Sequence, residues 1–324
     1  MKAIQFKEFG GPDVLENVDI DIPLPQGREV LIQVHASAVN YADTARREGQ
    51  YVVKTRLPYI PGAEVSGIVS EVGEGVKRVK KGDRVVAMMD SGGYAEFALT
   101  DERSIIPIPY GLDFKIVAAI PVQGLSAYHI LKTLGRLQQG ETVLIHAAAG
   151  GVGLLAVQLA KRFGAGKVIA TASTENKLLL AKEMGADVLV NYSEDEWEKK
   201  VLDATSGNGV DLALEMAGGD IFYKTLKCLA HFGRMIIYGV ASGEQSRFYP
   251  SSLMAKNQSV TGFFLPPLMR NSELTKKILN EIFQYVAIGD LKVTVGHVFP
   301  LEEAAKVHSL MQGRQTVGKV ILQP

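Results

Sequence analysis

The fold is decided by residues 142–160, which read TVLIHAAAGGVGLLAVQLA and carry no charged side chain. Glu141 precedes the stretch, and Lys161 and Arg162 follow it. Its length approaches that of a transmembrane helix, which takes about 20 mostly apolar residues. The centre, HAAAGGVG, consists almost entirely of very small side chains, a composition that also suits a turn wrapped closely around a ligand. The stretch is therefore either a membrane span or a binding turn.

The periodicity of the stretch separates these alternatives. Residues 143–146 form a strand-like apolar run, and a helical spacing of apolar residues follows it. The predicted helix begins near Val152, and one of its faces would carry Val152, Leu155, Ala156, Leu159 and Phe163. Such a one-sided pattern is typical of an amphipathic helix, and a helix surrounded by lipid has no need of it. The stretch is predicted to be a strand, a turn and a helix.

The turn has the pattern Ala147-x-x-Gly150-x-x-Gly153-x-x-Ala156. Minimal side chains let backbone amides approach a pyrophosphate, and the positive end of the helix dipole stabilises the anion. Because Ala147 stands at the first position, the match to the dinucleotide fingerprint GxGxxG is imperfect, and a purely structural tight turn is the alternative. Its place at the first strand-to-helix turn of an alternating domain favours a dinucleotide site.

Composition limits the class of protein and its partners. The 324 residues are 47% hydrophobic and 22% charged, values typical of a globular protein of about two domains. Lys plus Arg and Asp plus Glu number 35 each, so no global charge points to nucleic acid or an anionic membrane. The one cysteine, Cys228, excludes an internal disulfide framework and fits a reducing compartment. The first residues lack the apolar core of a secretory signal, so we expect a cytoplasmic protein.

The pattern of apolar residues divides the chain into two parts. Residues 1–122 read as short strands separated by Gly and Pro turns, which predicts a β barrel or sandwich. Residues 123–265 contain apolar runs with helical patterns in at least four of the gaps, as a doubly wound parallel sheet requires. The six runs are TVLIHA, KVIATA, DVLVNY, VDLALEMA, RMIIYGV and SVTGFFL. Residues 266–324 begin with a loop and a helix and end in a strand, VGKVILQP, which we expect to complete the first domain.

The end of the second apolar run indicates which dinucleotide is bound. Sheets that bind NAD usually offer an acidic side chain about 20 residues past the glycines. Here KVIATA runs into Ser173, Thr174, Glu175, Asn176 and Lys177. Hydroxyls and a lysine suit the 2′-phosphate of NADPH, and we predict this cofactor. Glu175 is counter-evidence, and Ser173 or Thr174 could also serve as a helix N-cap.

Longer motifs extend the argument to the whole chain. They are MKAIQFKEFGGPDVL, PYIPGAEVSGIVSEVGEGVKRVKKGDRV, VQGLSAY, ETVLIHAAAGGVG, ENKLLLAKEMGADVLVNY and GRQTVGKVIL. With these motifs the chain resembles the quinone oxidoreductase (zeta-crystallin-like) branch of the medium-chain dehydrogenase/reductase superfamily. The resemblance implies an α/β protein with a GroES-like β domain, 1–122 completed by 266–324, and a Rossmann domain, 123–265. The nicotinamide is expected in the cleft between them.

Zinc alcohol dehydrogenases of this superfamily carry ligands that the chain lacks. Their GHE motif reads Gly62-Ala63-Glu64 here, Asn40 stands near the position of a cysteine ligand, and MMDSGGYAEF is too short for their four-cysteine lobe. The six histidines show no metal spacing either. We predict no metal site. Without a Lewis acid the acceptor must take hydride directly, which a quinone or a conjugated enone can do.

The resemblance also assigns site residues, though no catalytic acid, base or triad. Tyr51 and Tyr59, with Asn40, are candidates for the acceptor pocket, and an aromatic surface of the β domain is the alternative for the two tyrosines. Ala45 replaces a tyrosine of some relatives, which widens the pocket. Lys177 and especially Lys319 could instead be solvated surface charges. The cofactor set is Asn40, Ser126, Gly150, Gly151, Val152, Ser173, Lys177, Tyr192, Tyr238, Gly239, Phe263, Phe264, Leu265, Gly318 and Lys319.

Three functions follow, in order of preference. The first is a zinc-independent NADPH-dependent quinone oxidoreductase, a homodimer because SVTGFFL would otherwise be an exposed sheet edge. The second is an NADPH-dependent reductase of α,β-unsaturated ketones, aldehydes or acyl thioesters. The third is a non-catalytic protein that binds NADPH or nucleic acid. The neutral charge balance argues against nucleic acid. The sequence has one compact basic run, KRVKKGDR. No membrane partner is expected.

Overall fold

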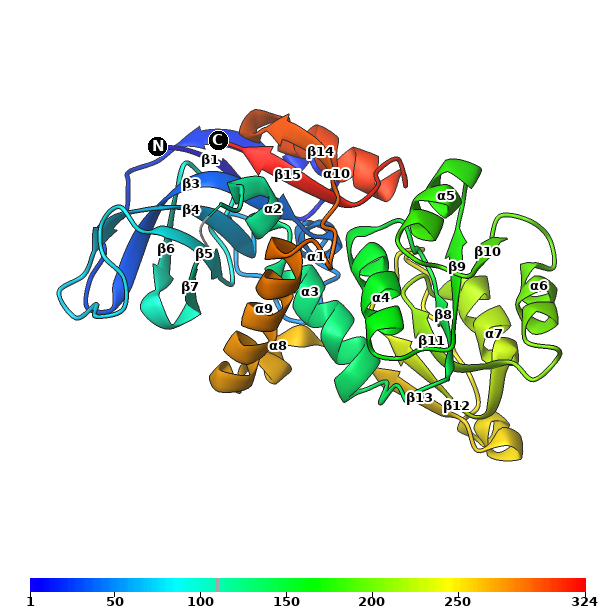
Figure 1. Ribbon diagram of the computed structural model, residues 1–324. Helices are drawn as coiled ribbons and strands as arrows, with labels where there is room; N and C mark the ends of the chain where they lie inside the picture. Colours follow the sequence, from blue (N-terminus) through cyan, green and yellow to red (C-terminus); the bar gives the residue numbers. More distant parts are fainter. Residues whose placement is uncertain (109–110) are drawn as a thin grey trace. The chain divides into compact units, whose positions relative to one another are not determined.

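The computed structural model describes residues 1–108 and 111–324, and the chain forms two compact units (Figure 1). One unit comprises Met1–Val122 with Val293–Pro324, and the other comprises Gln123–Lys292. Residues 266–292, which the sequence analysis assigned to the first domain, therefore pack within the second unit. The reason is visible at Arg162, whose guanidinium lies 3.5 Å from the ring centroid of Tyr285 and 3.2 Å from Asp290 Oδ2.

The second unit is built on a six-stranded parallel sheet with the order β10-β9-β8-β11-β12-β13. Each predicted apolar run forms one strand. The strands are β8 (Thr142–Ile145), β9 (Lys167–Ala172), β10 (Val188–Asn191), β11 (Val210–Glu215), β12 (Leu229–Ile237) and β13 (Ser259–Gly262). The order reverses between β8 and β11, as in doubly wound dinucleotide-binding sheets. The predicted Rossmann architecture is confirmed.

Helices fill four gaps between these strands, as predicted. They are α4 (Gly151–Arg162), α5 (Glu175–Glu183), α6 (Trp197–Ala204) and α7 (Gly219–Cys228), whereas a 3-10 segment, η4 (Pro250–Lys256), joins β12 to β13. Figure 1 shows α4 and α5 on one face of the sheet and α6 and α7 on the other. The α6–α7 face buries Trp197 and Phe222 against Leu144 and Ile169.

Helix α4 is buried more widely than its periodicity predicted. Leu155, Ala156 and Leu159 are buried as expected, but Leu154 and Val157 are buried as well, and Val152 is only half-buried. The helix packs on β8 and β9 and against a π-helical segment, η3 (His129–Thr133), so two of its sides are covered. No helix in the described part of the chain is long and apolar enough to cross a bilayer. The prediction that 142–160 forms a strand, a turn and a helix is confirmed.

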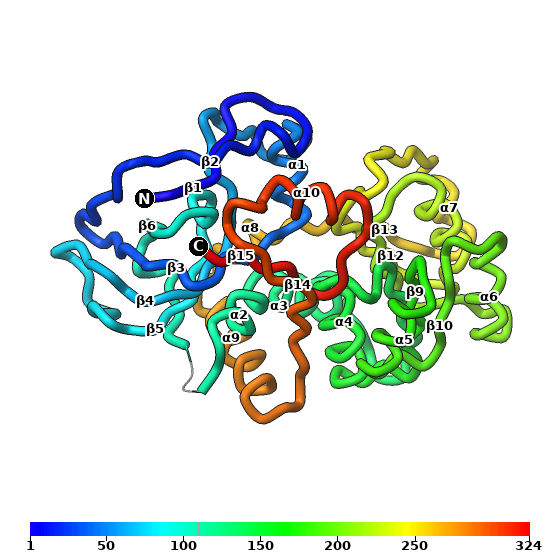
Figure 2. The backbone as a smooth tube through the Cα atoms, turned by 90° about the horizontal axis from the view of Figure 1, so that it is seen from above, coloured from blue at the N-terminus to red at the C-terminus, as the bar shows by residue number. Residues whose placement is uncertain are grey.

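The first unit contains a seven-stranded sheet with the order β14-β15-β3-β4-β5-β7, in which β6 also pairs with β3. Its strands are β3 (Glu29–Val39), β4 (Glu64–Val72), β5 (Arg84–Met88), β6 (Phe97–Asp101), β7 (Ile105–Pro107), β14 (Val295–Pro300) and β15 (Lys319–Gln323). A separate antiparallel pair joins β1 (Lys2–Gln5) to β2 (Glu16–Asp19). Strand β15 pairs antiparallel with β3, with Val320 opposite Val39, and Figure 2 shows the red C-terminal strand beside β3.

The remaining helices are short except α9. In the first unit they are η1 (Pro12–Val14), α1 (Tyr41–Arg47), η2 (Glu102–Ser104), α2 (Phe114–Ala118), η5 (Leu301–Glu303) and α10 (Ala304–Gln312). Helix α3 (Pro121–Tyr128) begins at the boundary between the units, and α8 (Leu265–Met269) and α9 (Ser272–Ala287) follow β13. The loop expected where the C-terminal segment begins, over the sequence FFLPPLMRNSE, is wrong for α8. Prolines are tolerated in the first turn of a helix, so they do not exclude one here.

Candidate functional site

The predicted cofactor residues of the second unit follow the carboxyl ends of its strands. Strand β8 leads to Gly150, β9 to Ser173, β10 to Tyr192, β12 to Tyr238 and β13 to Phe263. Because all six strands are parallel, these ends lie along one edge of the sheet. Ligands of open α/β sheets bind at this edge, next to the point where the strand order reverses.

The turn after β8 has the geometry of an anion cradle. Gly150 is the N-cap of α4, and Gly151 and Val152 are its first residues. The N–H groups of a first helical turn lack partners within the helix, and the dipole favours a negative ligand there. A Cβ added to Gly151 would overlap the side chain of Gln123, and one added to Gly153 would overlap the carbonyl oxygen of Ala147. The residues present thus fit a pyrophosphate that approaches the backbone.

Ala147, the departure from the fingerprint, has a backbone conformation that favours glycine. Its φ is +48°, in the left-handed region, which costs an L-residue about 1–2 kcal/mol. The next amide, Ala148 N–H, donates to Thr171 O at 3.0 Å and ties the turn to β9. The turn therefore holds an alanine in a conformation that glycine would adopt without this cost.

The segment after β9 carries the residues predicted to select NADPH. Ser173 is half-buried, Thr174 is the N-cap of α5, and Lys177 lies in the first turn of that helix. Thr174 is thus the N-cap residue by position, as one alternative expected, but its side chain makes no capping hydrogen bond. Tyr192 N–H donates to Ala172 O at 3.2 Å, which brings the end of β10 next to Ser173.

Glu215 lies at the same edge and was not singled out from the sequence. It ends β11, its side chain is buried, and its Oε1 accepts hydrogen bonds from Ala217 N (2.6 Å) and Gly218 N (2.9 Å). Burial raises the pKa of the carboxyl group. Tyr238 N–H donates to Glu215 O at 2.9 Å and aligns the ends of β11 and β12. The sequence signal that could have identified Glu215 is an acidic residue at the end of the apolar run VDLALE.

Three further predicted residues of this unit lie in helix α3 or at the start of helix α8. Ser126 is buried in α3, Phe264 is the N-cap of α8, and Leu265 is the buried first residue of α8. Gly239 follows Tyr238 directly after β12. The remaining predicted residues, Asn40, Tyr51, Tyr59, Gly318 and Lys319, belong to the first unit.

In the first unit, Asn40 is held by a buried ion pair. Lys319 Nζ lies 2.6 Å from Glu64 Oε1 and 2.7 Å from Asn40 Oδ1, and Asn40 Nδ2 donates to Glu64 Oε1 at 3.0 Å. Val122 N–H donates to Glu64 Oε2 at 2.8 Å. The interpretation of Lys319 as a solvated surface charge is wrong, because only 1% of its side chain is exposed. Its ammonium fixes the orientation of the Asn40 amide.

Gly318 positions the lysine of this pair. Its φ is +56°, and an added Cβ would overlap the carbonyl oxygen of Thr294. That same oxygen accepts a hydrogen bond from Lys319 N at 2.8 Å. Glycine is therefore required directly before Lys319, because no side chain fits while β15 keeps its place.

A second polar layer supports Asn40 from beneath α1. Asp43 Oδ2 accepts hydrogen bonds from Asn40 N (2.8 Å) and Tyr94 Oη (3.1 Å), and burial raises the pKa of Asp43 to about 6. Tyr94 Oη also lies 3.3 Å from His308 Nε2, and His308 Nδ1 lies 3.4 Å from Arg47 Nη1. Burial lowers the pKa of His308 to about 3, so it is neutral. Because Tyr94 Oη donates to Asp43, it can accept a hydrogen bond from His308. The Nε2–H tautomer of His308 provides this donor and leaves Nδ1 to accept from Arg47 Nη1.

Tyr51 and Tyr59 are brought together by Arg46. The guanidinium carbon lies 4.2 Å from the ring centroid of Tyr51 and 5.4 Å from that of Tyr59. Tyr59 Oη donates to Asp90 O at 2.7 Å. Burial raises the pKa of both tyrosines, so both are protonated at neutral pH. The two rings are half-buried parts of one cluster, whereas the alternative from the sequence was an aromatic surface of the β domain.

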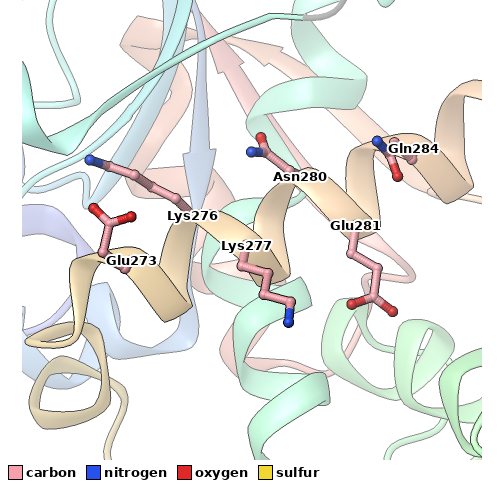
Figure 3. A pocket seen from close by; sticks show the side chains of 6 residues that line it. All are labelled: Glu273, Lys276, Lys277, Asn280, Glu281 and Gln284. Carbon is pink, nitrogen blue, oxygen red and sulfur yellow. The ribbon is translucent and has the colours of Figure 1, made fainter.

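An open groove of about 600 Å³ runs along α9 (Figure 3). Its lining is Glu273, Lys276, Lys277, Asn280, Glu281 and Gln284. In Figure 3 their side chains stand out from the helix in different directions and do not converge on one point. The groove contains none of the predicted site residues. Among the residues that the structure describes, no three His, Cys, Asp or Glu side chains form a group that could hold a metal ion.

The chain is similar to known proteins over nearly its whole length. Residues 26–110 match the family described as "Alcohol dehydrogenase GroES-like domain", and residues 151–284 match "Zinc-binding dehydrogenase". The chain is 37% identical to a quinone oxidoreductase of Homo sapiens, over 99% of this chain and 97% of the relative. It is 35% identical to a quinone oxidoreductase of Pseudomonas aeruginosa, over 100% and 99%. The solved structure of Escherichia coli quinone oxidoreductase complexed with NADPH superposes with a TM-score of 0.95, at 34% identity and over 100% of both chains.

The buried pair predicts a large effect of removing its cation. Lys319→Met should lower the free energy of unfolding by about 3 kcal/mol, because Glu64 would stay buried without a counter-charge. Adding Glu64→Gln should recover part of the loss. Urea unfolding measures both. The control is Lys7→Met, whose ion pair with Glu16 is exposed and should cost less than about 1 kcal/mol. Equal losses for Lys319→Met and the control would contradict this account.

Proposed function

Because this chain belongs to the quinone oxidoreductase family, we propose that it is a zinc-independent NADPH-dependent quinone oxidoreductase. The observation that carries the proposal is the glycine turn before α4, whose backbone fits a pyrophosphate at the reversal point of the parallel sheet. The names of the relatives and the NADPH complex of the Escherichia coli structure support it. In the proposed reaction a quinone, NADPH and a proton yield a hydroquinone and NADP⁺.

NADPH, when bound, supplies the hydride, and this chain's residues hold and orient both reactants. The amides of Gly150, Gly151 and Val152 would bind the pyrophosphate. Lys177, with Ser173 and Tyr192, would bind the phosphate of the adenosine. The nicotinamide half would be held by Asn40, Ser126, Tyr238, Gly239, Phe263, Phe264, Leu265, Gly318 and Lys319. Tyr51 and Tyr59 would contact the acceptor.

The donor set around Asn40 supports chemistry without zinc. Zinc relatives carry a cysteine near the position of Asn40 and a histidine at the position of Ala63. Here the Lys319 ammonium contacts both Asn40 and Glu64, so an internal cation already compensates the Glu64 carboxylate. An amide and a paired carboxylate are poor zinc ligands compared with Cys and His. A quinone suits such a site because it accepts hydride without a Lewis acid.

Turnover with matched acceptors tests the proposal. With NADPH supplied, we expect steady-state reduction of benzoquinone at a higher kcat/KM than that of a simple cyclic enone. The reverse order would favour reduction of α,β-unsaturated ketones, aldehydes or acyl thioesters. Tight NADPH binding without oxidation by any quinone or enone would contradict both enzymatic functions and favour a non-catalytic role.

Lys177 should determine the preference for NADPH over NADH. We expect Lys177→Ala to raise the KM for NADPH about tenfold, because a charge-assisted contact with the 2′-phosphate is lost, and to leave the KM for NADH nearly unchanged. The control is Lys182→Ala, an exposed lysine on the same helix. Equal changes in both Michaelis constants would refute the assignment of Lys177 to the phosphate.

We also propose a cytoplasmic homodimer. Strand β13 is the last in its sheet, and Val260 and Thr261 on it are only half-buried. A second copy could pair with this edge and protect it. Light scattering should then give about twice the chain mass of 35.1 kDa. A mass of one chain across the micromolar range would contradict the dimer. The buried, lone Cys228 supports a reducing compartment, which cell fractionation can test.

A further inference from the structure

Arg46 and its neighbour Arg47 differ in how the protein compensates their charges. Arg47 is fully buried, and its guanidinium donates to Glu48 Oε1 (2.7 Å), Gln312 Oε1 (2.9 Å) and Gly10 O (3.0 Å). These contacts anchor α1 on α10 and on the N-terminal segment. Arg47 is therefore a structural residue whose charge is satisfied.

Arg46 is nearly as buried but is poorly neutralised. Its side chain is 13% exposed, and in the described part of the chain only Asp90 brings a carboxylate within 4.0 Å of its nitrogens. That distance is 3.7 Å, and the Asp90 side chain is 99% exposed. An exposed, long ion pair of this kind contributes little. The guanidinium of Arg46 is thus largely removed from water without a close counter-charge.

The guanidinium of Arg46 is nevertheless held in a defined place. The ring of Tyr51 lies 4.2 Å from it and the ring of Tyr59 lies 5.4 Å from it. Tyr59 is itself fixed by its bond to Asp90 O and by packing on Phe6, with centroids 5.5 Å apart. Stacking engages the face of a guanidinium and leaves donors in its plane for an anion.

The cluster of Arg46, Tyr51 and Tyr59 adjoins the Asn40 network. Asn40 is the N-cap of the same helix that carries Arg46. Asp43, which accepts from Asn40 N, is close enough to both tyrosines that its charge adds to the effect of burial in raising their pKa values, while Arg46 opposes it. The first-unit residue assigned to the nicotinamide and the uncompensated cation therefore share one short helix.

We propose that Arg46 is the specificity-determining cation of the acceptor site and that it favours quinones bearing a sulfonate or carboxylate group. Such an acceptor combines the two features that the cluster can bind, a planar conjugated ring beside the tyrosines and an anion in the plane of the guanidinium. A neutral quinone would contact the same rings without the charge-assisted bond. This inference rests on the proposed quinone reductase function.

Two quinones that differ only in charge test the proposal. With saturating NADPH, Arg46→Met should raise the KM for naphthoquinone sulfonate about tenfold or more and change that for unsubstituted naphthoquinone little. Arg46→Lys should retain part of the discrimination, because it keeps the charge and loses the planar fork. Arg103→Met is the matched control, since it removes an exposed arginine of the same unit that pairs with Asp101. It should affect neither constant.

A binding measurement separates this inference from the proposed function. Equilibrium dialysis of naphthoquinone sulfonate against the cofactor-free protein should show weaker binding to Arg46→Met by the same factor, and weaker binding to the wild type at high salt. If the wild type reduces neither quinone, the proposed function fails, while dialysis still decides the role of Arg46. Parallel KM changes for both quinones, or equal binding of the sulfonate to wild type and Arg46→Met, would overturn the proposal.

Discussion

The first unit depends on one interaction, the burial of the Lys319 ammonium between Glu64 and Asn40. Taking a lysine and a glutamate out of water is costly, and only good geometry with further hydrogen bonds offsets that cost. Here the Val122 amide and the Asn40 amide occupy the remaining positions on the Glu64 carboxylate. The pair joins β15, near the end of the chain, to β4 and to the start of α1. Consequently the C-terminal strand is needed both to complete the sheet and to orient Asn40.

The second unit relies on backbone geometry in place of paired charges. Its anion cradle is made of amides at the start of α4, and backbone packing admits only glycine at Gly153. Beneath the turn, His146 lies between Thr171 Oγ1 (2.8 Å) and Thr225 Oγ1 (2.7 Å), and burial lowers its pKa to about 3. A neutral histidine thus links β8 to β9 and α7 without adding a charge under the site.

Two cations of the first unit illustrate opposite uses of the same kind of charge. Lys319 is almost completely buried and is neutralised by Glu64, so it serves the architecture. Arg46 lies against two tyrosine rings, and among the described residues only the exposed Asp90 brings a carboxylate near it, at 3.7 Å. A guanidinium that is held in place without a close carboxylate can bind an anionic ligand. The contrast between the two residues carries the inference about acceptor charge.

The sequence by itself determined the features that arise from neighbouring residues. Periodicity separated β8 from α4, the alternation of apolar runs and helices identified the parallel sheet, and small residues identified the turn at Gly150. The tertiary structure alone decided the burial of Lys319, the burial of α4 on two sides and the packing of α9 with the second unit. Each of these depends on partners far along the chain, as Lys319 depends on Glu64 and Asn40. Local spacing carries no information about such partners, and a buried lysine therefore reads in sequence like an exposed one.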